Sequence, residues 1–167
     1  DGGHVNIYDF KSADPKPVAG FELASSHPDN HVNNVCFGVE TKRGASFPLL
    51  YITNGKVGSE LEWLCFVESI TRRGKRFSSE IAQTIELDGS KWAEKGYVSI
   101  FGAPSWLGDR ERGFLWIFSA RERTVAKVTK HAWENQYVAT KFRIPSLSEG
   151  AKVRLDENDI LDQVVFP

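Results

Sequence analysis

The segment 25–34 holds the densest group of side chains in this chain that could do chemistry. Two histidines, one aspartate and three asparagines fall within eight consecutive positions. These residues are His27, Asp29, Asn30, His31, Asn33 and Asn34. Imidazole nitrogens and side-chain oxygens can ligate a metal or hydrogen-bond a sugar hydroxyl, and histidine can exchange a proton near neutral pH. The segment is therefore the first candidate for a ligand-binding region.

The same residue types also have a purely structural interpretation. Asn and Asp side chains cap turns by bonding nearby backbone groups, and histidines in such turns are commonly solvated. The His-x3-His spacing of His27 and His31 would suit metal ligation on a helix, but Pro28 and the asparagines indicate a loop. No metal and no cofactor is therefore predicted.

Two further residues are candidates for the same binding face. Asn54 lies two residues after the apolar run 48–52, and Trp92 lies in the polar stretch 88–96, where its ring could stack on a sugar or cover the edge of a sheet. The hairpin between Trp106 and Arg112 is expected to be a solvated tip.

Conventional catalytic signatures are absent from the sequence. It contains no Gly-x-Ser-x-Gly elbow, no phosphate-binding Gly-x4-Gly-Lys, no His-Glu-x2-His and no Cys-x2-Cys. Carboxylates brought together by folding could still form an acid/base pair. The absence of signatures is mild evidence against an enzyme.

The candidate side chains must be positioned by β-strands. The sequence consists of short runs of β-branched and aromatic residues between clusters of turn-forming residues. Helical periodicity is almost absent, so the pattern predicts an all-β protein. Residues 33–38 are echoed by residues 97–102, which lie 64 positions later, and more faintly by residues 162–167. A repeat of about 64 residues favours β-propeller blades of four antiparallel strands.

Within this repeat we expect eleven strands of four kinds. The innermost strands are 33–38, 97–102 and 162–167, the second 48–52 and 114–118, the third 4–10, 63–70 and 125–131, and the outermost 18–23, 81–87 and 138–144. The single domain 1–167 then divides into blade pieces 1–24, 32–88, 96–145 and 153–167. This is an incomplete ring, whose remaining blades must come from missing chain or another copy. The alternative is one irregular β-sandwich.

Equivalent positions in the repeated strands are expected to be buried between sheets. They are Phe37, Phe101, Leu50, Trp116, Val67 and Val128. Cys36 and Cys65 fall on strands separated by a third, about 9 to 10 Å apart. A disulfide tolerates a Cα separation of roughly 7 Å at most, so both cysteines are predicted to be buried free thiols.

Several short strings in this chain resemble a family of uncharacterised secreted bacterial β-propeller proteins. The strings are residues 31–38 (HVNNVCFG), 47–52 (FPLLYI), 81–85 (IAQTI) and 159–162 (DILD) with the closing Phe166-Pro167. The resemblance implies a six-bladed-propeller-like fold, an extracytoplasmic location in the periplasm or at the cell surface, and more chain beyond Pro167. It transfers no catalytic residue.

Charge and hydropathy narrow the classes of partner. Lysine plus arginine total 21 against 22 acidic residues, so no basic footprint for nucleic acid is present. No apolar run approaches the roughly 20 residues that span a bilayer, so membrane insertion is not predicted. The chain contains no methionine, which indicates a processed or truncated amino terminus.

Two functions follow from this pattern. The leading one is a non-catalytic binding or scaffold propeller that recognises a glycan or a protein on the face where outermost strands connect to innermost strands. The alternative is a hydrolase or lyase acting on carbohydrate or a small ester, with His27 or His31 as the base and Asp29 as its partner.

Overall fold

A computed structural model describes residues 3–11, 13–28, 30, 32–54, 63–121, 137–144, 146–147 and 151–166. Within these ranges, the side chains of Asn33, residues 101–104, Arg121 and Ala151 are not described. Some predictions fall outside the described part. They concern the predicted strand 125–131, the side chains of Phe101 and Val128, and the candidate residues Asp29 and His31.

The described chain is all-β and forms one hairpin and two larger sheets. The hairpin pairs β1 (His4–Tyr8) with β2 (Pro17–Glu22). The five-stranded sheet has the order β10 (Ala151–Leu155), β6 (Arg76–Leu87), β5 (Leu64–Arg73), β4 (Leu50–Asn54) and β3 (Val32–Phe37). The four-stranded sheet has the order β11 (Ile160–Phe166), β9 (Tyr137–Arg143), β8 (Phe114–Arg121) and β7 (Ile100–Asp109). A 3-10 turn, η1 (Ala93–Lys95), precedes β7.

The order of the four strands predicted within residues 32–88 is confirmed. β3, β4, β5 and β6 form an antiparallel meander, and each strand pairs with its neighbour in the chain. Gly74, with a φ of 64°, turns the chain between β5 and β6. The sequence did not predict β10, which pairs with β6 in parallel at the outer edge of this meander.

The second predicted blade is wrong in its strand order. β8 pairs directly with β9, so no third strand lies between them, and β11 joins β9 in the same sheet instead of starting a new blade. The described strands form no closed ring, and the propeller architecture is not confirmed.

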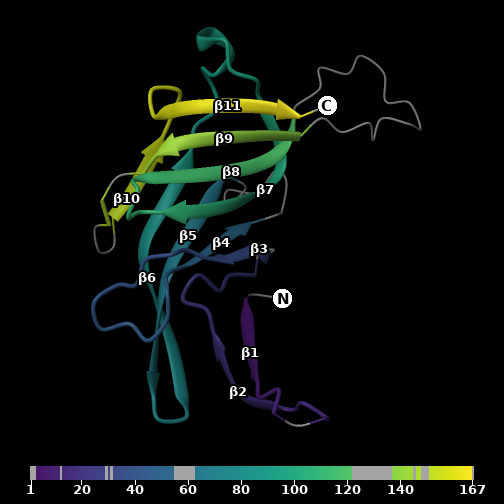
Figure 1. Cartoon of the computed structure of the whole chain (residues 1–167), viewed down its shortest axis with the longest axis vertical. Helices are drawn as coiled ribbons and strands as arrows, with labels where there is room; N and C mark the ends of the chain where they lie inside the picture. The colour runs from purple at the N-terminus through teal and green to yellow at the C-terminus, as the bar shows by residue number, and fades with distance from the viewer. Residues whose placement is uncertain are drawn as a thin grey trace, which may run out of the picture.

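The five-stranded sheet is covered on both faces. One face packs against the four-stranded sheet, whose strands β8, β9 and β11 run across β5 and β6 (Figure 1). The other face packs against β2, through Phe21 and Leu23. All five residues of β4 are buried because successive side chains point into these two different cores. Tyr51 enters the core between the sheets, whereas Leu50 and Ile52 enter the core under the hairpin.

The burial predictions are confirmed at two positions and wrong at two. Val67 and Leu50 are buried, at 0% and 3% exposure. Phe37 is 50% exposed because β3 is an edge strand, paired only with β4 among the described strands. Trp116 is half-buried because it points outward from the four-stranded sheet.

Both cysteines are free, as predicted. Cys36 lies in β3 and Cys65 in β5, and β4 separates them. Cys65 is fully buried and its burial raises the pKa of its thiol, whereas Cys36 is partly exposed. Within the ranges that the structure covers, no helix has the length and apolarity needed to cross a membrane.

Ion pairs hold β10 against the end of β6. Lys152 Nζ lies 2.5 Å from Glu86 Oε2, and Arg154 Nη2 lies 2.5 Å from Asp88 Oδ2. The backbone N–H of Ser90 donates to Asp88 Oδ1 at 3.0 Å. Bonds from Ser90, followed by the Arg154 pair, lower the pKa of Asp88 to about 2.

We expect Asp88 to contribute stability that depends on pH. The folded-state pKa is lower than the unfolded value of roughly 3.9, so the contribution is present above about pH 4 and lost as the pH falls towards 2. Asp88→Asn should cost about 1 kcal/mol or less at pH 6, because the pair is partly solvated, and only a small fraction of that at pH 2. Urea unfolding at both pH values measures this difference. Glu94→Gln, at an exposed carboxylate on η1, is the control, and an Asp88→Asn defect that persists unchanged at pH 2 would contradict the assignment.

Candidate functional site

The predicted polar segment begins with a turn that a buried carboxylate fixes. Glu68 is fully buried in β5, and its two oxygens accept hydrogen bonds from the backbone N–H groups of Ala24 at 3.0 Å and Ser25 at 2.7 Å. The amide of Asn30 then donates to the carbonyl oxygen of Ser25 at 2.9 Å. Asn30 is 1% exposed, so this side chain organises the turn.

The other predicted site residues whose side chains the structure describes differ widely in exposure. His27 is exposed on the turn. Asn34 is half-buried in β3, and its carbonyl oxygen accepts a bond from Thr53 Oγ1 at 3.5 Å. Asn54 is fully buried at the end of β4 opposite Val32. The backbone of Asn33 lies in β3, but its side chain is outside the described set.

Trp92 is a core residue, and the prediction of an accessible ring is wrong. It is 0% exposed, and its ring packs on Phe142 with centroids 5.6 Å apart. The polar residues around Trp92 in the sequence indicated a loop, which is correct, but the loop folds this one apolar side chain between the two sheets. A sugar cannot stack on a ring that is enclosed in this way.

A buried polar network joins the two sheets. Tyr51 Oη donates to Glu40 Oε1, Arg110 Nε lies 3.3 Å from the same carboxylate oxygen, and Arg110 Nη2 donates to Gln83 Oε1. Burial, and then the bond to Glu40, raise the pKa of Tyr51. Arg110 was expected at a solvated hairpin tip, but its side chain is only 9% exposed.

This network is suited to docking one sheet on the other and not to chemistry on a ligand. Its side chains are nearly enclosed, and Trp106 of the same hairpin is 1% exposed. A charged pair in such a place requires close geometric matching, because each charge has lost its hydration. The network therefore fixes where the β7–β8 hairpin sits on the five-stranded sheet.

An open hollow of about 520 Å³ lies at the tip of the β1–β2 hairpin. Two aspartates, two lysines and a valine line it; they are Asp9, Lys11, Asp14, Lys16 and Val18. Opposite charges alternate on its walls, and Asp9 uses a carboxylate oxygen to cap the backbone N–H of Lys11 at 3.0 Å. In the part of the chain that the structure describes, no group of three or more His, Cys, Asp or Glu side chains is arranged to hold a metal.

A group of large, partly accessible side chains lies on the outer face of the four-stranded sheet. Alternate residues of β8 point in opposite directions, so Leu115 and Ile117 fill the core and their neighbours face outward. The register places further outward side chains of β7, β9 and β11 beside them. We call this set the aromatic face; its members are Phe114, Trp116, Phe118, Tyr137 and Phe166, with Leu107 and Val164.

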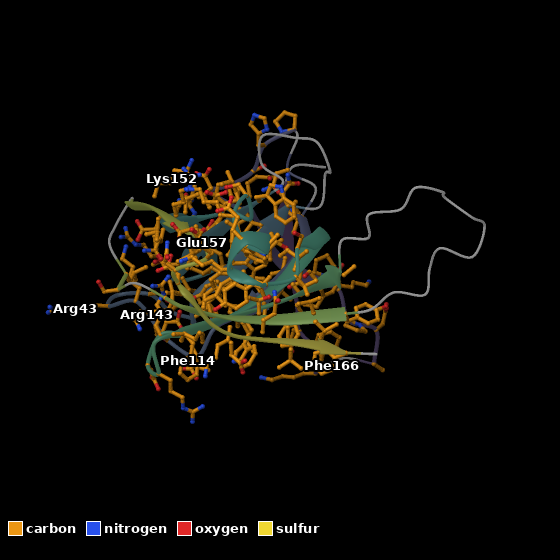
Figure 2. All side chains as sticks on the ribbon, turned by 90° about the horizontal axis from the view of Figure 1, so that it is seen from above. Arg43, Phe114, Arg143, Lys152, Glu157 and Phe166 are labelled. Carbon is orange, nitrogen blue, oxygen red and sulfur yellow. The ribbon has the colours of Figure 1, made fainter. Side chains whose placement is uncertain are left out.

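Three rings of the aromatic face are exposed to solvent, and those of Phe114 and Trp116 are half-buried. Phe118, Tyr137 and Phe166 are 46%, 57% and 44% exposed. The rings of Trp116 and Phe118 are stacked at 19°, with centroids 6.2 Å apart. Phe114 and Phe166 appear on the same side of the molecule in Figure 2. Exposed apolar patches often serve as interaction sites, so this face is a candidate binding surface.

Sequence reasoning missed this face although a signal for it exists. The run 114–118 alternates aromatic and aliphatic residues, which is the pattern of a strand with one buried and one accessible face. The repeat equates this run with the run 48–52 and so predicts that Trp116 is buried like Leu50. The aromatic members of the run are the outward ones.

No protein-family model, curated protein or solved structure matches this chain.

Proposed function

We propose that this chain is a non-catalytic binding module that recognises a glycan through the aromatic face of its four-stranded sheet. The observation that carries the proposal is the row of Phe114, Trp116 and Phe118 along β8, with accessible rings two residues apart. Side chains at that spacing on a strand repeat every roughly 6.8 Å, so the row offers successive ring surfaces along one line.

The composition of the face supports a glycan as the ligand. The apolar C–H faces of sugar rings stack on aromatic rings, while their hydroxyls need hydrogen-bond partners at the margins. Polar groups lie at those margins in register with the rings: Ser105 opposite Phe118, and Asp109 and Arg143 on either side of Phe114. The rings are rigid side chains, so ordering them on binding costs little entropy.

The propeller is the finer architectural part of the same proposal. The β3–β6 meander has the strand number and antiparallel order of one blade, which supports it. A secreted, extracytoplasmic location, implied by the family resemblance, suits a glycan-binding module and belongs to the proposal as well. Recognition of a protein on the same face is its rival.

The enzyme alternative receives no support from the described residues. His27, one of the two proposed bases, is exposed, whereas His31, the other proposed base, and Asp29, the proposed partner, lie outside the described part. A general base must be oriented by a second polar group within hydrogen-bonding distance of it. We therefore keep a hydrolase or lyase only as an alternative to be tested by activity assays on any glycan that binds.

Removing two rings of the aromatic face is the direct test. We expect the double variant Trp116→Ala/Phe118→Ala to weaken glycan binding at least about tenfold, since each lost ring removes contact area at the centre of the site. Isothermal titration against soluble β-glucan, xylan, mannan and pectin measures it. Phe37→Ala is the matched control, because Phe37 is 50% exposed against 46% for Phe118 but lies on the other sheet.

The outcomes separate the possibilities. Loss of binding in the double variant with retention in Phe37→Ala supports the aromatic face as the site. Wild-type affinity in both the double variant and Phe37→Ala would show that the binding site lies elsewhere. No binding of any of the four polysaccharides by the wild-type chain would reject the glycan proposal.

A further inference from the structure

The aromatic face contains one cation among its rings. The Nζ atom of Lys141, in β9, lies 3.8 Å from the ring centroid of Phe114 and 5.5 Å from that of Trp116. An ammonium over an aromatic ring is attracted by the negative face of the ring, so this contact holds the long side chain across the face. The charge of Lys141 therefore has a defined position within the proposed binding surface.

No carboxylate of the described residues forms an ion pair with Lys141. Asp162 is its cross-strand neighbour on β11, but the ion pairs within 4.0 Å do not include this pair. Asp162 Oδ1 instead accepts a bond from the N–H of Gln163 at 2.9 Å. The ammonium of Lys141 thus presents its donors to whatever lies on the aromatic face.

A second cation lies next to the first. Arg143 is two residues further along β9, so it points to the same side as Lys141, and it is the cross-strand partner of Phe114. The acid at this end, Asp109, is paired with Arg112 at 3.3 Å. Figure 2 labels Arg143 and Phe114 near the same end of the molecule. This end of the aromatic face therefore has an excess of positive charge.

We infer that the aromatic face selects an acidic polysaccharide, whose sugar rings stack on Trp116 and Phe118 while a ring carboxylate binds the ammonium of Lys141. This inference rests on the proposed function and names its ligand class. Stacking accounts for the rings, and the carboxylate supplies the anion that the described residues do not supply to Lys141. A neutral glycan would cover the same rings and leave the ammonium without a counter-charge.

Two forms of one polymer test the inference. Polygalacturonate and its fully methyl-esterified form have the same backbone and differ in the carboxylate charge. We expect the wild-type chain to bind the acid form about fivefold more tightly, with the preference shrinking between about 0.05 M and 0.5 M salt. Lys141→Met should abolish the preference, because methionine keeps most of the length of the side chain beside the rings but removes the charge. Lys141→Arg should keep the preference, and Lys91→Met, at an exposed lysine off the face, is the control.

Each outcome decides between the inference and the proposed function. A preference that is lost in Lys141→Met and kept in Lys91→Met supports the inference. Equal binding of the two polymers by the wild-type chain overturns it and leaves the glycan-binding function standing. A preference that survives Lys141→Met also overturns it, because another cation then recognises the carboxylate. Binding of neither polymer, nor of the neutral glycans, rejects the proposed function together with the inference.

Discussion

Replacing Gly108 with alanine is expected to destabilise the protein by about 3 kcal/mol. A Cβ atom on Gly108 in β7 would lie 2.7 Å from Cε1 of Tyr51 and closer still to Cζ and Oη of the same ring. On its other side the ring meets Gly38, where an added Cβ would lie 2.8 Å from Cε2. The ring of Tyr51 is thus held between two glycines of different segments.

The Tyr51 ring has little freedom to move away from an added methyl group. It is 1% exposed, and its hydroxyl is bonded to Glu40 in the network that also contains Arg110. Moving the ring would break this bond and leave a buried carboxylate with one partner fewer. The insertion therefore acts on the contact between the two sheets, not only on one strand.

Chemical denaturation of matched glycine variants measures the effect. Gly89→Ala is the control, because no atom lies within 4 Å of its added Cβ, and it should change the free energy of unfolding by no more than about 0.5 kcal/mol. Combining Gly108→Ala with Tyr51→Leu should cost less than the sum of the two single changes, since the smaller side chain removes the clash. Wild-type stability of Gly108→Ala, or full additivity in the double variant, would contradict this packing.

Replacing Glu68 with alanine is expected to cost about 3 kcal/mol as well. The change removes a carboxylate that is 0% exposed and leaves the N–H of buried Ser25 without its partner, in addition to a cavity. The N–H of Ala24 would still have a hydrogen-bond acceptor, because it also donates to Ser79 Oγ at 2.9 Å. Glu68→Gln should destabilise the protein less than Glu68→Ala, since the amide keeps the volume and one acceptor oxygen.

A surface acid in the neighbouring strand provides the comparison for Glu68. Glu80 in β6 pairs with Lys42 at 2.8 Å, and its side chain is 64% exposed, so Glu80→Ala should cost about 1 kcal/mol or less. Hydrogen exchange locates the defect: the amide of Ser25 should lose protection in Glu68→Ala and keep it in Glu80→Ala. Unchanged protection at Ser25 in Glu68→Ala would contradict the role of this carboxylate.

The candidate segment 25–34 shows why a polar cluster in a sequence is an ambiguous signal. The side-chain amide of Asn30, which could bind a ligand, instead donates to the carbonyl oxygen of Ser25. Which of these occurs depends on Glu68, which lies more than forty positions away in the sequence and fixes the turn from beneath. Residue types near one another in the chain cannot reveal a partner that the fold supplies from another strand.

The sequence by itself determined where most strands lie, because alternation with period two and turn-forming residues act locally. The same local logic separated Cys36 and Cys65 by one strand and predicted their free thiols correctly. It could not predict which strands pair over long distances, as the parallel addition of β10 to β6 and the direct pairing of β8 with β9 show.

Two runs of nearly the same composition show what only the tertiary structure decided. Leu50-Tyr51-Ile52 and Leu115-Trp116-Ile117 have the same pattern of an aromatic residue between two aliphatic ones. β4 lies in a sheet covered on both faces, so Tyr51 is enclosed in the core between the sheets. β8 lies in a sheet covered on one face, so Leu115 and Ile117 take the core and Trp116 faces outward. Burial of a strand depends on the layers that stack on it, and those layers come from elsewhere in the chain.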